Sequence, residues 1–344
     1  MLYDVSSHIS RKLKHVEACL NFEVDYQTRS AGFEHYDLPY KALPQTDLGK
    51  IDTHSSFLGK ALSFPFLIGA MTGGAELSGT INKHLAEAAE ATGVGLMLGS
   101  QRVMLANKKA RASFEVRAFA PTILLIGNLG VAQLNKGYGE THIVEAIESI
   151  GADALALHTN PLQEALQPGG DGDFTELVEK LNVLVPKVPH PLLLKEVGHG
   201  LSAEVALSVK DAGFAALDVA GAGGTSWAKV EDIVRYGELR HADLCEWGIP
   251  TTRALTNIHA ALPKMPLIAS GGVRSGLDIA KALGLGAGAV AIAKPLLKPA
   301  IESTQAVIDL IERYRTELKI AMHCAGAKDI ATLQKLNLEV EADN

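Results

Sequence analysis

From about residue 66 onward, short apolar runs alternate with longer amphipathic segments. Eight runs are apolar at successive positions and end in glycine or polar residues, a pattern typical of buried parallel strands. These runs are 65–71, 94–99, 122–128, 153–160, 191–198, 215–221, 266–272 and 289–295. The segments between them carry apolar residues at helical spacing, as in 81–89, and we expect helices to end at Gly93, Gly151 and Gly213.

Eight consecutive strand–helix units predict a TIM (β/α)8 barrel over residues 66–344, folded as a single domain. The alternative is an open, doubly wound parallel sheet, which is weaker because eight similar units without a long break favour closure. Residues 1–65 are polar and irregular, and we expect an N-terminal extension that contributes to the mouth of the active site. The stretch 221–250 is long for a loop after a strand, and long barrel loops are usually functional.

Composition narrows the classes of protein that remain. The chain has 344 residues, 47% hydrophobic and 21% charged, and a formal net charge of −7, which argues against a nucleic-acid-binding protein with a basic field. No apolar run is long enough to cross a membrane, and the N-terminus lacks the apolar core of a signal peptide. Cys19, Cys245 and Cys324 are too few and too far apart for a disulfide framework, so we expect a cytoplasmic protein.

Polar residues and glycines follow nearly every predicted strand. In a TIM barrel the active site lies at these carboxyl ends, so the residues there are the candidates for chemistry. One such end alone is as well explained by an ordinary polar loop, but seven or more together are not. The segments are 71–74, 100–102, 127–130, 158–164, 195–200, 221–227, 270–276 and 293–295.

The segment SGGVRSG (270–276), followed by a helical pattern, is the most specific of these signals. Its glycines expose backbone N–H groups at a helix N-terminus, which suits a phosphate, and barrels commonly bind phosphate after strands seven and eight. The alternative is a purely structural helix cap built on Ser275 and Asp278, which have capping-box spacing.

Three charged or titratable positions have two or more interpretations. Lys195 ends an apolar strand and could form a Schiff base, face an anionic cofactor, or pair with Glu196 or another carboxylate. Glu164 could hold Mg²⁺ beside a substrate phosphate, or be a solvated helix-start glutamate. His158 at a strand end could be an acid or base, although a lone histidine is more often structural.

A basic cluster, RKLKH, occupies 11–15 of this acidic chain. An exposed cluster of this kind is usually only solvated. Folded over the barrel mouth, it would supply positive charge for a phosphate or diphosphate.

Taken together, these motifs resemble the type 2 isopentenyl-diphosphate delta-isomerases, a family of FMN enzymes. The resemblance covers nearly the whole chain in order, and SQR, HxNxxQE and GGTSW are specific to that family among FMN barrels. Two small departures are Lys14, where the family usually has an acidic residue, and a variant final strand at 284–295. The matching segments are RKLKH (11–15), MTGG (71–74), SQR (100–102), GNLG (127–130), HTNPLQE (158–164), QPGGDGDF (167–174), KEVGHG (195–200), DVAGAGGTSW (218–227) and ASGGVRSG (269–276).

The resemblance implies a role for each matched position. FMN would contact Ala70, Met71, Thr72, Ser100, Asn128, Lys195 and Thr225, and its phosphate would bind at Gly271, Gly272, Arg274, Ala293 and Lys294. The substrate diphosphate would bind Arg11, Lys12, Ser100, Gln101 and Arg102, with His158, Asn160 and Gln163 positioning the substrate. Glu164 would bind Mg²⁺, and the catalytic candidates are His158, Gln163 and Lys195.

The implied reaction moves a double bond, converting isopentenyl diphosphate to dimethylallyl diphosphate in isoprenoid biosynthesis. Reduced FMN would act as acid and base, NADPH would serve only to reduce the flavin, and Lys195 would stabilise the anionic reduced flavin, which displaces the Schiff-base interpretation. The family also implies a homo-oligomer, a tetramer or an octamer, with a small-molecule partner and neither nucleic acid nor membrane.

Three other functions compete with this one. A 2-hydroxy-acid oxidase would need a His–Arg pair in a late motif, and no histidine flanks SGGVRSG. A nucleotide dehydrogenase would need a catalytic cysteine at a strand end, where only Cys245 comes near. A flavin- or phosphate-binding regulatory protein would not need Glu164 and the basic cluster together.

Overall fold

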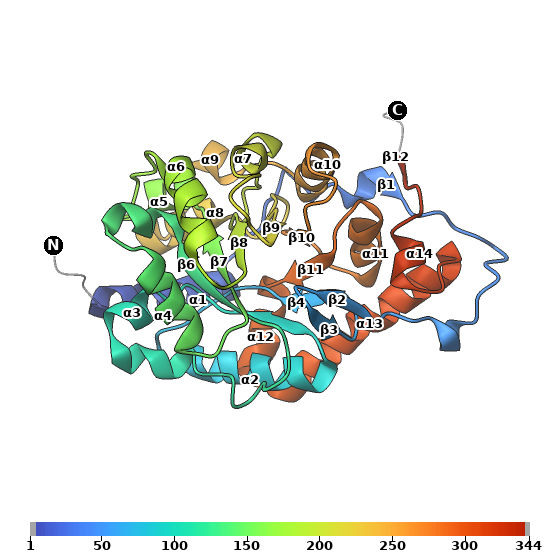
Figure 1. The fold of residues 1–344 in the computed structure, drawn as a ribbon, viewed down its shortest axis with the longest axis horizontal. Coiled ribbons are helices and arrows are strands. Elements are labelled where there is room, and N and C mark those ends of the chain that lie inside the picture. Colours follow the sequence, from blue (N-terminus) through green and yellow to red (C-terminus); the bar gives the residue numbers. More distant parts are fainter. Residues whose placement is uncertain (1–4, 341–344) are drawn as a thin grey trace.

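Eight parallel strands form a closed barrel in the computed structural model, which describes residues 5–340. The last strand, β11, pairs in parallel with the first, β4, so the sheet closes and the open-sheet alternative is wrong. All eight predicted strands are present, although each is shorter than its apolar run (Figure 1). They are β4 (Phe66–Ile68), β5 (Gly95–Met97), β6 (Leu125–Gly130), β7 (Ala154–His158), β8 (Leu192–Lys195), β9 (Ala216–Asp218), β10 (Leu267–Ser270) and β11 (Ala289–Ile292).

Alternate residues of each strand face two separate apolar layers. In β4, Leu67 points into the barrel, whereas Phe66 and Ile68 pack outward against the helices, as the two-residue period of a strand requires. The hairpin of β2 (Ser55–Phe57) and β3 (Lys60–Leu62) adds Phe57 and Leu62 to the inner layer. Since Phe57 lies beside Gly288, just before β11 begins, the hairpin closes the amino end of the barrel and leaves the carboxyl end open.

Helices surround the barrel, and of the three predicted to end at a glycine, one does so and two end earlier. The helix predicted to end at Gly93 does end there, and Gly93 has a φ angle of 68°. The helices expected to reach Gly151 and Gly213 end at Glu148 and Ser208, because the chain there tightens into hydrogen bonds between residues three apart. The helices are α2 (Glu76–Thr92), α3 (Arg102–Ala106), α4 (Glu140–Glu148), α5 (Pro161–Leu166), α6 (Leu177–Leu184), α7 (Ala203–Ser208), α8 (Trp227–Tyr236), α9 (Ala242–Cys245), α10 (Thr251–Ala261), α11 (Gly276–Gly284), α12 (Lys294–Glu302), α13 (Thr304–Ala325) and α14 (Ile330–Leu333).

The expected irregular extension begins instead with a 17-residue helix, α1 (Val5–Asn21). It packs against α8, α3 and α12, with Val16 and Ala18 buried. After α1 the chain continues past β1 (Tyr36–Asp37), which pairs with β12 (Glu339–Val340), and then runs beside α13 (Figure 1). Between residues 5 and 340, no helix is both long enough and apolar enough to span a membrane.

Candidate functional site

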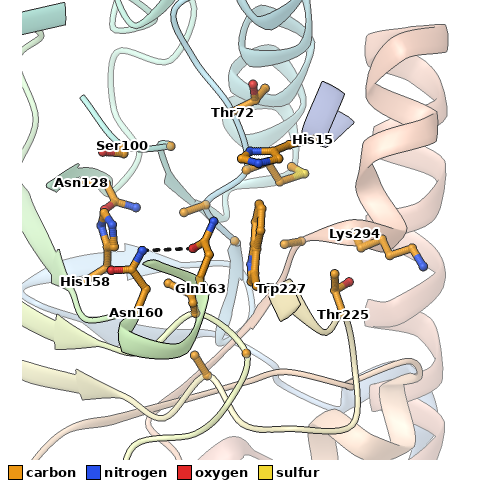
Figure 2. A pocket seen from close by; sticks show the side chains of 18 of the residues that line it. His15, Thr72, Ser100, Asn128, His158, Asn160, Gln163, Thr225, Trp227 and Lys294 are labelled. Atoms are coloured by element: carbon orange, nitrogen blue, oxygen red, sulfur yellow. Dashed lines mark hydrogen bonds between the residues drawn. The ribbon is translucent and has the colours of Figure 1, made fainter. Parts of the chain in front are cut away.

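A cavity of about 270 Å³ opens at the carboxyl ends of the barrel strands and is lined by residues that follow all eight of them. Helix α1 completes its wall with Arg11, Lys12 and His15. Figure 2 shows His15 beside the cavity. With one exception, every residue predicted to bind cofactor, substrate or metal lines this cavity. They are Arg11, Lys12, Ala70, Met71, Thr72, Ser100, Arg102, Asn128, His158, Asn160, Gln163, Glu164, Lys195, Thr225, Gly271, Gly272, Arg274, Ala293 and Lys294.

Gln101 is the exception. Its side chain is fully buried behind the cavity wall, where Nε2 donates to the carbonyl of Ala146 at 2.7 Å and Oε1 accepts from the amide of Asn128 at 2.8 Å. Gln101 therefore supports the backbone of β6 at Asn128. Its side chain does not reach the space where a diphosphate would lie.

One face of α1 brings the basic cluster to the cavity. Arg11, Lys12 and His15 lie on this face, whereas Lys14 points to solvent. The ammonium group of Lys12 donates to the carbonyl of Ser100 at 2.8 Å and lies 5.4 Å from the ring centroid of Phe114. Burial, together with the charge of Arg11, lowers the pKa of Lys12 to about 7.

His158 and Asn128 form a polar pair at the ends of β7 and β6. The Nδ1 atom of His158 lies 2.7 Å from Oδ1 of Asn128. Burial, followed by the charges of Lys195 and Lys12, lowers the pKa of His158 to about 3, so the ring is neutral near pH 7. A neutral imidazole can position a substrate but is a poor proton donor to an alkene.

A hydrogen-bonded chain at the cavity wall links the start of α5 to α8. Asn160 donates to Gln163 at 3.1 Å (Figure 2). Gln163 donates to Glu231 on α8 at 2.9 Å. The Oε1 atom of Glu231 also lies 3.1 Å from Nε2 of His15, whose ring meets Trp227 edge-on at 5.3 Å. Glu231 is fully buried, and this chain fixes the orientation of the Gln163 amide beside the cavity.

Glu164 lines the same cavity and is held by three donors. Its carboxylate accepts from Asn160 at 3.0 Å, from the amide of Asp171 at 2.6 Å and from Gln167 at 3.3 Å. Within residues 5–340, no group of three carboxylate, histidine or cysteine side chains is placed to hold a metal ion. One fixed carboxylate fits a Mg²⁺ ion that takes its other ligands from water and a substrate diphosphate.

Lys195 faces the cavity from the end of β8 and makes no ion pair with Glu196. Its ammonium donates to the backbone carbonyl of Glu196 at 2.6 Å. The Glu196 carboxylate instead accepts hydrogen bonds from the four amides of its own loop, residues 197–200, at 2.5 to 3.1 Å. Burial lowers the pKa of Lys195, opposed by the charges of Asp218 and Glu196, and burial raises the pKa of Asp218 on the neighbouring strand.

A glycine turn forms the other end of the cavity. Gly271 and Gly272 have φ angles of 94° and 74°, and a Cβ on Gly271 would lie 2.0 Å from the carbonyl oxygen of Gly221. The predicted capping box of Ser275 and Asp278 is present, and it occupies the amides of residues 274, 275 and 278. The amide of Gly276 donates to Glu317 at 2.7 Å. A phosphate here would therefore meet the amides of the glycine turn, since Asp278, Ser275 and Glu317 occupy four amides around the start of α11.

The side chains of Arg274 and Lys294 carry positive charge to this turn. Both contact the carboxylate of Asp25 at 2.8 Å, and the hydroxyl of Thr225 donates to the same carboxylate at 3.2 Å. Because two cations and a hydroxyl surround this carboxylate, the position favours an anion. The glycine turn, the two cations and the cavity beside them fit an FMN with its phosphate at residues 271–274.

Two cavity residues, His15 and Trp227, and one buried residue behind the wall, Glu231, had no role assigned from the sequence. His15 and Trp227 lay within recognised motifs, and the helical spacing from Arg11 to His15 placed His15 beside the cations. Glu231 had no signal beyond its place in the long 221–250 stretch, because only the fold brings it against α1 and α5.

Comparisons with known proteins agree with this geometry. A family model described as FMN-dependent dehydrogenase matches residues 126–340. The chain is 53% identical to an isopentenyl-diphosphate delta-isomerase of Mycolicibacterium gilvum, over 94% of this chain and 95% of that protein. It is 50% identical to the protein of the same name in Deinococcus radiodurans, over 93% and 95% of the two chains. A solved mandelate oxidase variant with benzaldehyde superposes with a TM-score of 0.67 at 20% identity, covering 98% of this chain and 96% of that one, which shows a shared fold.

Proposed function

The chain belongs to the isopentenyl-diphosphate delta-isomerases, within the FMN-dependent dehydrogenase family, and from this premise we propose how its own residues carry out the isomerisation. The substrate pair is isopentenyl diphosphate and dimethylallyl diphosphate. The observation that carries the proposal is a single cavity with an anion site at each end: the glycine turn at residues 271–274 and the cationic face of α1. Two anionic groups, the phosphate of a cofactor and the diphosphate of a substrate, can then bind on opposite sides of one apolar-walled space.

The diphosphate end consists of Arg11, Lys12 and Arg102, with Glu164 beside them. Arg102 is held at 2.5 Å by Asp171, whose amide in turn donates to Glu164, so the cation and the carboxylate are positioned by the same loop. Mg²⁺ on Glu164 would neutralise charge on the diphosphate and fix its position.

The alkene end lies between the Asn160–Gln163–Glu231 chain and the flavin position. A neutral alkene is a weak base, so a proton donor must stand close to it in a space that excludes water. A bound FMN, once reduced by NADPH, would supply this acid and base chemistry. Gln163 and His158 orient the hydrocarbon, and the buried Lys195 ammonium stabilises negative charge that develops beside it.

The oxidase alternative has less support from the cavity. It requires a histidine close to the arginine of the late motif. Among the described residues, the histidines that line the cavity are His15 on α1 and His158 at the end of β7, whereas Arg274 follows β10. The similarity to mandelate oxidase supports a shared fold only. The choice between the two reactions therefore depends on the residues of the site.

A turnover assay tests the proposal. Purified protein is incubated with isopentenyl diphosphate, FMN, NADPH and Mg²⁺, and dimethylallyl diphosphate is quantified. We expect product only when the flavin is reduced, with no net consumption of NADPH. Product formed with oxidised flavin, or no product with reduced flavin and Mg²⁺, would refute it.

The proposal includes three further predictions that come from the sequence. We propose NADPH as the reductant, a tetramer or octamer as the assembly, and the cytoplasm as the location. Each follows from the resemblance of the motifs to the family, and size-exclusion chromatography with light scattering tests the assembly directly.

A further inference from the structure

We propose that Asp25 is an internal counter-anion of the phosphate site, which competes with the cofactor phosphate for the positive charge of Arg274 and Lys294 and thereby sets the affinity for FMN. The inference rests on the proposed function in one respect, that the site binds FMN. It adds a residue that the motifs of the cavity do not include, since Asp25 lies in the segment after α1.

The contacts of the Asp25 carboxylate resemble those of a bound anion. Oδ1 lies 2.8 Å from the Lys294 ammonium and accepts from the Thr225 hydroxyl at 3.2 Å, while Oδ2 lies 2.8 Å from a terminal nitrogen of Arg274. Burial raises the pKa of Asp25, but the hydrogen bond from Lys294 and the charge of Arg274 outweigh it and keep this pKa below its ordinary value. The carboxylate is therefore charged and neutralises cations that would otherwise attract a phosphate at full strength.

The backbone holds Asp25 in this place. The amide of Tyr26 donates to Gly224 at 2.9 Å, and the amide of Ser226 donates to Val24 at 2.9 Å, so residues 24–26 pair as an antiparallel bridge with 224–226. Lys229 adds a hydrogen bond to the Asp25 carbonyl at 2.8 Å. Because this pairing fixes the segment, the carboxylate stays near the two cations instead of sampling solvent.

Asp25 lines a second cavity beside the main one. Arg274 and Lys294 line both cavities, whereas Asp25 lines only the second. A phosphate on the glycine turn and the carboxylate of Asp25 would then share the same two cations. Since both are anions, removal of the carboxylate charge strengthens the attraction for the phosphate.

The test compares Asp25→Asn with wild type in equilibrium binding of FMN and of riboflavin, which lacks the phosphate. We expect the dissociation constant for FMN to fall by roughly fivefold, the scale of a partly exposed ion pair, while that for riboflavin is unchanged. Glu23→Gln is the matched control, because Glu23 carries the same charge two residues away and accepts a hydrogen bond from the Asp25 amide, which a glutamine oxygen can also accept. This control should leave both constants unchanged.

Two outcomes of this comparison decide against the inference. Unchanged or weaker FMN binding by Asp25→Asn would mean that Asp25 only positions the cations, and equal tightening of FMN and riboflavin would place its effect away from the phosphate. If Asp25→Asn does not fold, as judged by circular dichroism, Asp25→Ser is measured by the same criteria. Wild-type protein that binds FMN without isomerase turnover would refute the proposed function and leave the Asp25 result standing, whereas absence of FMN binding would refute both.

Discussion

Asn128 accepts a hydrogen bond from His158 across adjacent barrel strands, with 2.7 Å between Oδ1 and Nδ1. An amide oxygen can only accept, so this contact places the proton of the neutral ring on Nδ1. Burial and the charges of Lys195 and Lys12 lower the pKa of this ring, so His158 lines the cavity without adding a charge of its own.

This geometry predicts a His158 ring that stays neutral in acid. Its pKa of about 3 lies below the ordinary value, so the ring should remain unprotonated at about pH 5, where a free histidine is charged. Nitrogen-15 NMR of histidine-labelled protein, assigned with His158→Gln, should show the Nδ1–H tautomer. Titration with a midpoint near the ordinary value, or an Nε2–H signal, would contradict the assignment.

Lys12 should make substrate binding depend on pH. Its pKa of about 7 means that the ammonium is charged below this pH and neutral above it, so affinity for the diphosphate should fall as the pH rises through 7. We expect the KM for isopentenyl diphosphate to rise between about pH 6 and about pH 9. Lys12→Arg keeps its charge throughout and should abolish this rise, and an identical profile in the variant would exclude Lys12 as its source.

Glu164→Gln should raise the Mg²⁺ concentration that gives half-maximal activity by about tenfold or more, because the amide lacks the charge of the only proposed protein ligand. Glu179→Gln is the matched control, since Glu179 is exposed on α6 and does not line the cavity. Equal Mg²⁺ titrations for both variants would remove Glu164 as the ligand.

Gly271→Ala should destabilise the protein much more than Gly137→Ala. Both glycines have positive φ angles, 94° and 87°, so both substitutions should cost about 1 kcal/mol in backbone strain. Only at residue 271 does a Cβ also meet backbone, at 2.0 Å from the Gly221 carbonyl, whereas nothing lies within 4 Å at residue 137. Urea unfolding of the cofactor-free variants measures the difference, and equal losses would mean that the turn at 271 adjusts without cost.

The barrel and most of its site could be predicted from the sequence because they depend on local signals. Strand runs, glycine turns and the capping box of Ser275 and Asp278 are all set by residues close in the chain. The role of Gln101 could not be read in this way, since its burial depends on where α4 places the carbonyl of Ala146. Glu231 and Asp25 were missed for the same reason: each gains its partners from segments at a large separation in sequence.

The position of α1 also bears on the order in which the protein can assemble. The helix and the segment after it are synthesised before their partners in α8 and the 224–226 loop, which follow about two hundred residues later, as in the contact between Asp25 and Lys229, 204 positions apart. Contacts at such separation form late, because a long stretch of chain must be ordered before they are made. A nascent chain that ends before α8 would therefore carry the basic cluster without a surface to hold it, and affinity for anions would arise only as the barrel nears completion.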